Sequence, residues 1–193
     1  TDIYAPRVEV QAPETGDTFS IGATCEIEWM ATDGDGVTAI DLDYTADEGA
    51  TWVPISSDET NDGAFTWTLP NLGVGASIQV RVTARDAEEN AGYGISGTFL
   101  LDDFTAPSIT LSSPVGGESW SGDSTQAITW ISSDNVGVTE VNLEYSLDSG
   151  NTWLGLAQNL AANGSYDWTV PNINASLLLR ATALDAASHV ADT

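Results

Sequence analysis

The sequence contains no lysine and only one cysteine, one histidine and one methionine in 193 residues. Four arginines stand against 29 aspartates and glutamates, so the formal net charge at pH 7 is −25. A surface of this sign repels nucleic acid and anionic lipid, and neither is an expected partner. Because Cys25 is alone, no internal disulfide can form. Its alternation with Ile27 and Trp29 predicts a small buried side chain rather than a reactive thiol.

The residues that most catalytic centres need are scarce too. His189 is the only histidine, so the sequence offers neither a Ser-His-Asp triad nor a multi-histidine metal site. It contains no HExxH, GxSxG or phosphate-binding glycine motif. Carboxylate pairs for glycoside hydrolysis are not excluded by counting, but the acids fall in predicted exposed loops without sign of a deep cleft. The sequence therefore predicts a protein that is not an enzyme.

No apolar run is long enough to cross a membrane, and the segment shows no signal peptide or lipidation motif. We therefore expect no membrane insertion. An export signal would have been removed or would lie outside these 193 residues.

What the sequence does contain is a repeat. The segment Tyr44–Trp52 returns as Tyr145–Trp153, in the shared form Tyr-[Ser/Thr]-x-Asp-x-Gly-x-Thr-Trp, 101 residues later. Similar pairs continue along both halves, and after a two-residue deletion the offset becomes 99, which pairs Arg81 with Arg180. This duplication predicts two domains, residues 1–102 and 103–193.

Within each copy, apolar and polar residues alternate with the period of a strand, as in residues 25–29 and 40–44. About seven short strands per copy, without helical periodicity, predict an all-β fold of two tandem immunoglobulin-like antiparallel β-sandwiches. The second copy stops before its equivalent of the last strand, residues 95–101. We expect either a segment cut from a longer array or a strand that a neighbouring chain donates.

Two arginines are expected on the outward faces of these sandwiches. Arg81 and Arg180 would lie beside Asp43 and Glu144 of the neighbouring strand, which predicts one cross-strand ion pair in each copy.

The repeated nine-residue segment resembles the Asp-box, a hairpin found in sialidase propellers and in other β folds. The resemblance implies a structural role, in which the aspartate accepts hydrogen bonds in the turn and the tryptophan packs under the hairpin. The residues that would fill this role are Asp47, Gly49, Trp52, Asp148, Gly150 and Trp153. A sialidase itself is a poor match, because those enzymes resemble six-bladed propellers with an arginine triad.

More of the chain resembles the tandem immunoglobulin-like or fibronectin III-like repeats of secreted prokaryotic surface proteins. The matching segments are Pro114–Trp120, Ile128–Trp130, Tyr145–Trp153 and Trp168–Pro171. The resemblance implies a secreted or cell-surface protein with a structural or adhesive role. It leaves two alternatives open: a carbohydrate-binding or spacer appendage of a secreted hydrolase, and a subunit of an extracellular filament assembled by strand donation.

The expected partners follow from this resemblance. They are other copies or neighbouring repeats of the same protein, with surface glycans left open. Tyr4, Tyr93 and Phe104 are the aromatic residues near loops or linkers, and they are too few to define a sugar site.

Acidic residues recur at three equivalent places in both copies: before Ala-Pro, after the second strand and after the sixth. In an immunoglobulin-like sandwich these segments meet at one end, and carboxylates gathered there are unfavourable without a cation. We therefore expect calcium, which would stiffen the junction between the copies; aspartates that only form turns are the alternative. The candidate ligands are Asp2, Asp33, Asp35, Asp86, Asn90, Asp102, Asp103, Asp134, Asn135 and Asp185.

Overall fold

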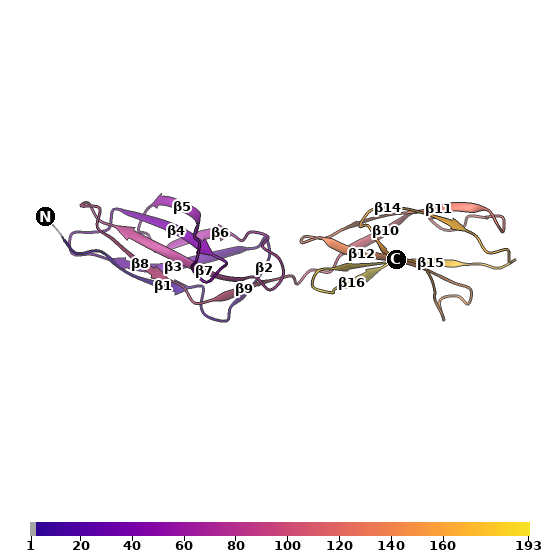
Figure 1. Cartoon of the computed structure of the whole chain (residues 1–193), viewed down its shortest axis with the longest axis horizontal. Coiled ribbons are helices and arrows are strands. Elements are labelled where there is room, and N and C mark those ends of the chain that lie inside the picture. The colour runs from indigo at the N-terminus through magenta and orange to yellow at the C-terminus, as the bar shows by residue number, and fades with distance from the viewer. Residues whose placement is uncertain (1–2) are drawn as a thin grey trace. The chain divides into compact units, whose positions relative to one another are not determined.

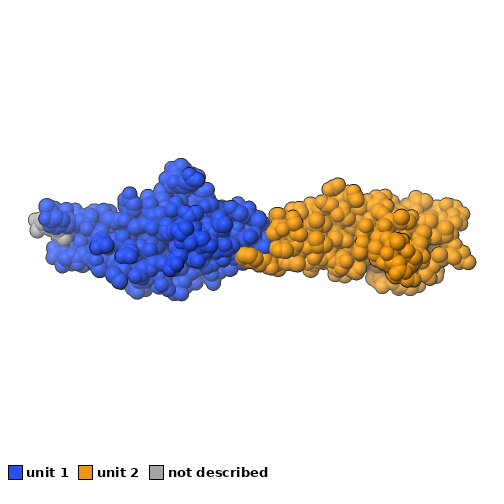
Figure 2. Space-filling model, turned by 90° about the horizontal axis from the view of Figure 1, so that it is seen from below, with its two compact units in different colours: residues 1–103 blue, residues 104–193 orange. Residues whose placement is uncertain are grey.

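The computed structural model describes residues 3–193, and this part of the chain forms sixteen strands and no helix. It therefore holds no helix that could span a membrane. The predicted all-β class is confirmed. The chain divides into two compact units, Thr1–Asp103 (unit 1) and Phe104–Thr193 (unit 2), one residue from the boundary expected from the sequence (Figure 2).

Unit 1 is a sandwich of two sheets (Figure 1). Its strands are β1 (Arg7–Ala12), β2 (Thr18–Ser20), β3 (Thr24–Thr32), β4 (Ala39–Thr45), β5 (Val53–Glu59), β6 (Ala64–Thr68), β7 (Ser77–Arg85), β8 (Ala91–Ile95) and β9 (Phe99–Asp102). One sheet has the order β1-β3-β6 and the other β2-β9-β7-β4-β5, with β8 also paired to β7. The pairs are antiparallel except for β2 with β9, which run parallel.

The core of unit 1 follows from the period-two pattern. Along β3 and β7 every second residue is buried, because successive side chains of a strand point to opposite faces. Cys25 is one of the buried residues of β3, as predicted, and its burial raises the thiol pKa to about 11. The side chain therefore remains a protonated thiol at neutral pH and serves as core packing.

Unit 2 repeats this architecture with fewer strands. Its strands are β10 (Ser108–Ser113), β11 (Thr125–Ser133), β12 (Val138–Ser146), β13 (Leu154–Leu160), β14 (Gly164–Thr169), β15 (Leu178–Asp185) and β16 (Val190–Asp192). The two sheets have the orders β10-β11-β14 and β13-β12-β15-β16. The core consists of Ile128, Trp130, Val141, Leu143, Trp168, Val170, Ala181 and Ala183.

The two units differ at one edge. Strand β16 pairs with β15 as β8 pairs with β7, but the part of unit 2 that the structure describes has no counterpart of β9. Among the described residues of unit 1, from residue 3 to Asp103, β9 is the only strand that pairs with β2. The matching segment of unit 2, around Trp120, consequently has no partner strand and does not form one.

Candidate functional site

The loop between β4 and β5 is held together by Asp47. Its Oδ1 accepts the Thr51 amide at 2.8 Å and the Thr45 hydroxyl at 2.7 Å, and its Oδ2 accepts the Thr51 hydroxyl at 2.6 Å. These bonds lower the pKa of Asp47 to about 2, and the largest effect is that of the Thr51 hydroxyl, before the Thr51 amide and the Thr45 hydroxyl. Gly49 adopts a φ of 88°, which favours glycine, and lies against the Trp52 ring. The hairpin thus has the structural role that the Asp-box resemblance implies.

Unit 2 contains the same hairpin between β12 and β13. Asp148 accepts the Thr152 amide at 2.8 Å and the Thr152 hydroxyl at 2.7 Å, while the Ser146 hydroxyl donates to it at 2.8 Å. These bonds, led by that of the Thr152 side chain, lower the pKa of Asp148. In each unit, the strand before the hairpin, β4 or β12, begins after one of the predicted metal loops and ends at the hairpin. The hairpin and that loop therefore lie at opposite ends of the strand.

An arginine covers each hairpin tryptophan. The Arg81 guanidinium lies 4.4 Å from the Trp52 ring centroid and 2.8 Å from Asp43, which confirms the predicted ion pair. In unit 2 the predicted pair is confirmed as well, with 3.0 Å between Arg180 Nε and Glu144 Oε2, and Arg180 stacks 4.2 Å from the Trp153 centroid. The sequence reasoning missed the stacking, although the repeated Trp and Arg at matching positions were the available signal.

The acidic loops of unit 1 are closed by their own hydrogen bonds. Asp86 is buried, and it accepts the backbone amides of Glu88 and Asn90 at 2.8 and 2.9 Å and the Asn90 side-chain amide at 2.7 Å. The bond from the Asn90 side chain is the main cause of a lowered Asp86 pKa. Asp33 accepts the amide of the exposed Asp35 at 3.0 Å. Asp2, the remaining candidate ligand of this group, lies outside the described residues.

The β3–β4 loop and the β7–β8 loop of unit 1 meet as expected. Thr38, which follows Asp33 and Asp35, donates its hydroxyl to the backbone oxygen of Asp86 at 2.9 Å. The two acidic loops therefore lie at the same end of unit 1.

The matching loops of unit 2 differ in one respect. Asp134 accepts the amides of Val136 and Gly137 on Oδ2, each at 2.8 Å, but its Oδ1 is buried without a hydrogen-bond partner. Asp185 is buried, and Thr139, which follows the Asp134 loop, donates its hydroxyl to the Asp185 backbone oxygen at 3.0 Å. Asp134 and Asp185 thus lie at the same end of unit 2.

His189 was missed as a member of this loop. Its backbone amide donates to Asp185 Oδ1 at 2.9 Å, and its Nδ1 lies 2.9 Å from Oδ2. The signal was available, because the offset of 99 that aligns Asp86 with Asp185 also aligns Asn90 with His189.

The other candidate ligands are placed as follows. Asp102 ends β9 and accepts the Asp103 amide on Oδ1 at 2.9 Å. Asp103 is buried, and Asn135 is exposed.

The aromatic residues Tyr4 and Tyr93 in unit 1 and Phe104 in unit 2 are exposed. Surface glycans stay an open alternative among the expected partners.

Residues 6–80, all within unit 1, match the family of the bacterial Ig domain. The resemblance to immunoglobulin-like repeats is thereby confirmed for the first copy, and the duplication extends the same pattern to the second. A comparison with curated proteins found no match.

Among solved structures, the chain is similar to the fibronectin(III)-like modules of Clostridium thermocellum CbhA, with 17% identity, a TM-score of 0.40 and coverage of 95% of this chain and 88% of that one. It is also similar to a tetra-tandem repeat from the extending region of a large adhesion protein, with 19% identity, a TM-score of 0.43 and coverage of 98% of this chain. Here the chain spans about half, 48%, of the other chain. A third structure, the amphioxus IgVJ-C2 molecule, has 16% identity and a TM-score of 0.43, and the match covers 91% of this chain and 96% of that chain.

The two β-sandwiches, together with the family match of residues 6–80, make the chain a pair of tandem Ig-like β-sandwich modules. Bacterial Ig-like domains are typically extracellular surface modules. The fold is typically non-catalytic.

Proposed function

We propose that this chain is an extracellular structural or adhesive tandem module that calcium stiffens at the junction of its two units. The observation that carries the calcium part is the Oδ1 oxygen of Asp134, which is buried in unit 2 without a hydrogen-bond partner. A buried carboxylate oxygen without a partner is costly, and a bound cation removes that cost.

Asp185 would supply a second ligand. Its carboxylate is fully buried at the same end of unit 2, where Oδ1 accepts the His189 amide and Oδ2 lies 2.9 Å from His189 Nδ1. A carboxylate oxygen has two lone pairs, so it can accept one hydrogen bond and still bind a metal ion. Asn135, in the same loop as Asp134, adds an exposed amide oxygen.

The oxygen donors favour calcium. Carboxylates and amide carbonyls are the ligands of a hard cation, and the net charge of −25 raises the local concentration of divalent cations. Asp102 and Asp103 lie in the segment that joins the units. An ion that bound them together with Asp134 and Asp185 would restrict the motion of that segment, which is the stiffening that we propose.

The same proposal covers Asp2, Asp33, Asp35, Asp86 and Asn90 in unit 1, with weaker binding. Both carboxylate oxygens of Asp86 already accept hydrogen bonds from its own loop, so an ion would relieve less cost there.

Thermal unfolding of the chain with millimolar calcium tests the binding step. Ligand that binds only the folded state stabilises it by about 2.7 kcal/mol at a concentration of 100 times Kd, so the melting temperature should rise and EDTA should reverse the rise. Asp134→Asn keeps the size of the side chain and should abolish the unit 2 response. Asp148→Asn, in the hairpin, is the matched control: it should lower the melting temperature and leave the calcium response intact. An unchanged melting temperature with calcium would contradict the proposal.

Stiffening and the extracellular setting need separate measurements. Small-angle scattering with and without calcium should show a narrower range of interdomain distances with calcium, and Asp103→Asn should remove this narrowing. A thermal shift without narrowing would mean that calcium binds but does not stiffen the junction. A protease added to intact cells that produce this protein should degrade it. Full resistance to the added protease would contradict an extracellular location.

A further inference from the structure

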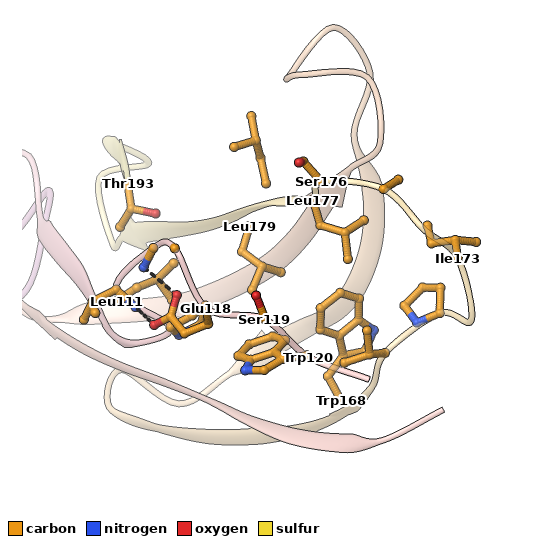
Figure 3. Close-up of a pocket in the computed structure, with 18 of the residues that line it drawn as sticks. Leu111, Glu118, Ser119, Trp120, Trp168, Ile173, Ser176, Leu177, Leu179 and Thr193 are labelled. Atoms are coloured by element: carbon orange, nitrogen blue, oxygen red, sulfur yellow. Dashed lines mark hydrogen bonds between the residues drawn. The ribbon is translucent and has the colours of Figure 1, made fainter. Parts of the chain in front are cut away.

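The large sheet of unit 2 has a hollow on the face turned away from the core. The hollow has a volume of about 350 Å³ and lies over β12, β13, β15 and β16. It shares no lining residue with the larger pocket beside Trp120 and Trp168 (Figure 3). We propose that the hollow binds one ring of an uncharged glycan. The polar side chains that line it are those of Asn142, Glu144, Gln158, Arg180, Thr182 and Asp192.

Three matched replacements distinguish this face from its counterpart in unit 1. There, the Arg85 guanidinium bonds Asp41 at 3.1 Å and Asp58 at 2.7 Å across the sheet. The repeat offsets align these three residues with Leu184, Asn142 and Asn159. The backbone bond at this place is kept, with 3.1 Å between the Asn159 amide and Asn142 Oδ1 against 3.0 Å in unit 1. Unit 2 therefore keeps the strand geometry but lacks the guanidinium that crosses the face in unit 1.

The replacements favour an uncharged ligand, because two amides and a leucine stand where unit 1 has three charged groups. The cation of the hollow, Arg180, is already bonded to Glu144 Oε2 at 3.0 Å. An anion would find this charge neutralised and would also have to approach a chain of net charge −25. A neutral polar molecule meets neither obstacle.

The polar groups of the hollow match those of a sugar. The side chains of Gln158 and Thr182 each donate and accept hydrogen bonds, and Asp192 accepts them. Within the described part of the chain, no hydrogen bond is made to these three side chains. Neighbouring hydroxyls of a sugar ring also donate and accept, so they can replace water at such groups. A volume of about 350 Å³ lies at the small end of ligand pockets, which favours a single ring.

Arg180 is held in position by two partners. Glu144 accepts its Nε at 3.0 Å, and its guanidinium carbon lies 4.2 Å from the Trp153 ring centroid. Its side chain is nevertheless 28% exposed, so the guanidinium still reaches solvent. A donor that is fixed in this way loses little conformational freedom when a ligand binds.

The openness of this face does not depend on residues beyond Thr193. In unit 1, β8 and β9 both extend the large sheet beside β7 and leave its outward face uncovered. The side chain of Arg81, the counterpart of Arg180, is 29% exposed there. Tyr93, the counterpart of Asp192, is exposed as well. A further strand in unit 2 would likewise extend the sheet in its own plane.

Titration with neutral oligosaccharides tests the inference. The hexaoses of glucose, mannose, xylose and N-acetylglucosamine are added separately to the isotope-labelled 193-residue chain in the presence of EDTA. At least one should shift the NMR signals of the Gln158 side-chain amide and of the Thr182 backbone amide until saturation. Sodium chloride at about 0.5 M should not weaken this binding, because the ligand carries no charge to be screened.

Two substitutions in the hollow should weaken the binding. Thr182→Val keeps the shape of the side chain and removes its hydroxyl, and Gln158→Leu removes the amide. Each should weaken binding at least about tenfold, because a sugar hydroxyl loses its partner. Thr83→Val, at the equivalent position of unit 1, is the matched control and should bind as the parent chain does.

A triple variant rebuilds the arrangement of unit 1. Asn142→Asp, Asn159→Asp and Leu184→Arg together should restore the three charged groups and place a guanidinium across the hollow. Binding should be abolished, while the melting temperature stays near that of the parent chain.

The absence of saturable shifts with all four hexaoses at millimolar concentration would overturn the inference. Unchanged affinity in Thr182→Val and Gln158→Leu would overturn it too, as would binding that appears only when calcium is added. The titrations contain EDTA, and none of the substitutions changes a proposed calcium ligand. The inference and the proposed function can therefore fail separately.

Discussion

The Nδ1 nitrogen of His189 lies 2.9 Å from Oδ2 of Asp185. In unit 1 the side-chain amide of Asn90 takes the same place, 2.7 Å from Oδ2 of Asp86. In both loops the backbone amide of the same residue donates to the other carboxylate oxygen, at 2.9 Å. An imidazole and an amide thus close equivalent loops by bonding the buried carboxylate four residues earlier.

This equivalence predicts that His189→Asn retains the stability of unit 2. His189→Ala should lower the free energy of unfolding by about 1 kcal/mol, because the buried Asp185 carboxylate loses one hydrogen-bond partner. Urea unfolding of the full chain measures both variants, and the reciprocal Asn90→His is the control in unit 1. If His189→Asn destabilised unit 2 as much as His189→Ala does, the ring rather than the hydrogen bond would be the important feature.

The hairpin aspartates predict a loss of stability in acid. The pKa of Asp47 is about 2 in the folded chain, against 3.8 for an unperturbed aspartate, so the unfolded chain takes up the proton first as the pH falls. The contribution of Asp47 is therefore complete above about pH 4 and is lost as the pH falls towards about 2. Asp148, whose pKa is also lowered, should act in the same direction in unit 2.

Asp47→Asn tests this linkage by calorimetry from pH 2 to pH 7. The variant should melt a few degrees lower at neutral pH and lose less stability on acidification, because it has no carboxylate to protonate. Glu48→Gln, a change at the exposed neighbour, is the control and should leave the acid dependence unchanged. An Asp47→Asn chain with the full acid dependence of the parent would contradict the assignment.

The arginine–tryptophan stacks predict that Arg81→Lys is not conservative. A lysine keeps the charge near Asp43 but loses the planar contact with the Trp52 ring. The side chains of Arg81 and Asp43 are both partly buried, so their ion pair is shielded in part from solvent. We expect a loss of about 0.5–1.5 kcal/mol in the free energy of unfolding. Arg7→Lys, at an exposed position of β1, should change the free energy of unfolding little.

A double-mutant cycle of Arg81→Lys with Trp52→Leu separates the stacking from the ion pair. The two changes should be less than additive if the ring contact matters. Full additivity would assign the effect to Asp43 alone.

The strands and the hairpins could be predicted because their causes are local in the chain. The alternation at residues 25–29 follows from the two-residue period of a strand, and it yields the buried positions of β3. The hairpin bonds of Asp47 connect residues only two and four positions apart, so the nine-residue motif contains all of its own donors. The duplication aligned the acidic residues of the two copies, and the order of strands in an immunoglobulin-like sandwich determines which loops share an end. The acidic loops could therefore be placed together from the sequence.

The details of the candidate site depend on distances between side chains that no sequence pattern specifies. Asp86 and Asp185 align in the repeat, yet one is bonded by an amide and the other by an imidazole. The buried Oδ1 of Asp134 without a partner is likewise visible only once the loop has folded around it.

The sequence by itself determined the all-β class, the two copies, the position of Cys25 in a core strand and the structural role of the hairpins. Each of these follows from periodicity, repetition or bonds between near neighbours in the chain. Only the tertiary structure decided that Arg81 and Arg180 stack on Trp52 and Trp153, and that His189 bonds Asp185. These relationships join residues from separate strands and loops, and they exist only when the packed sheets bring those residues within contact distance.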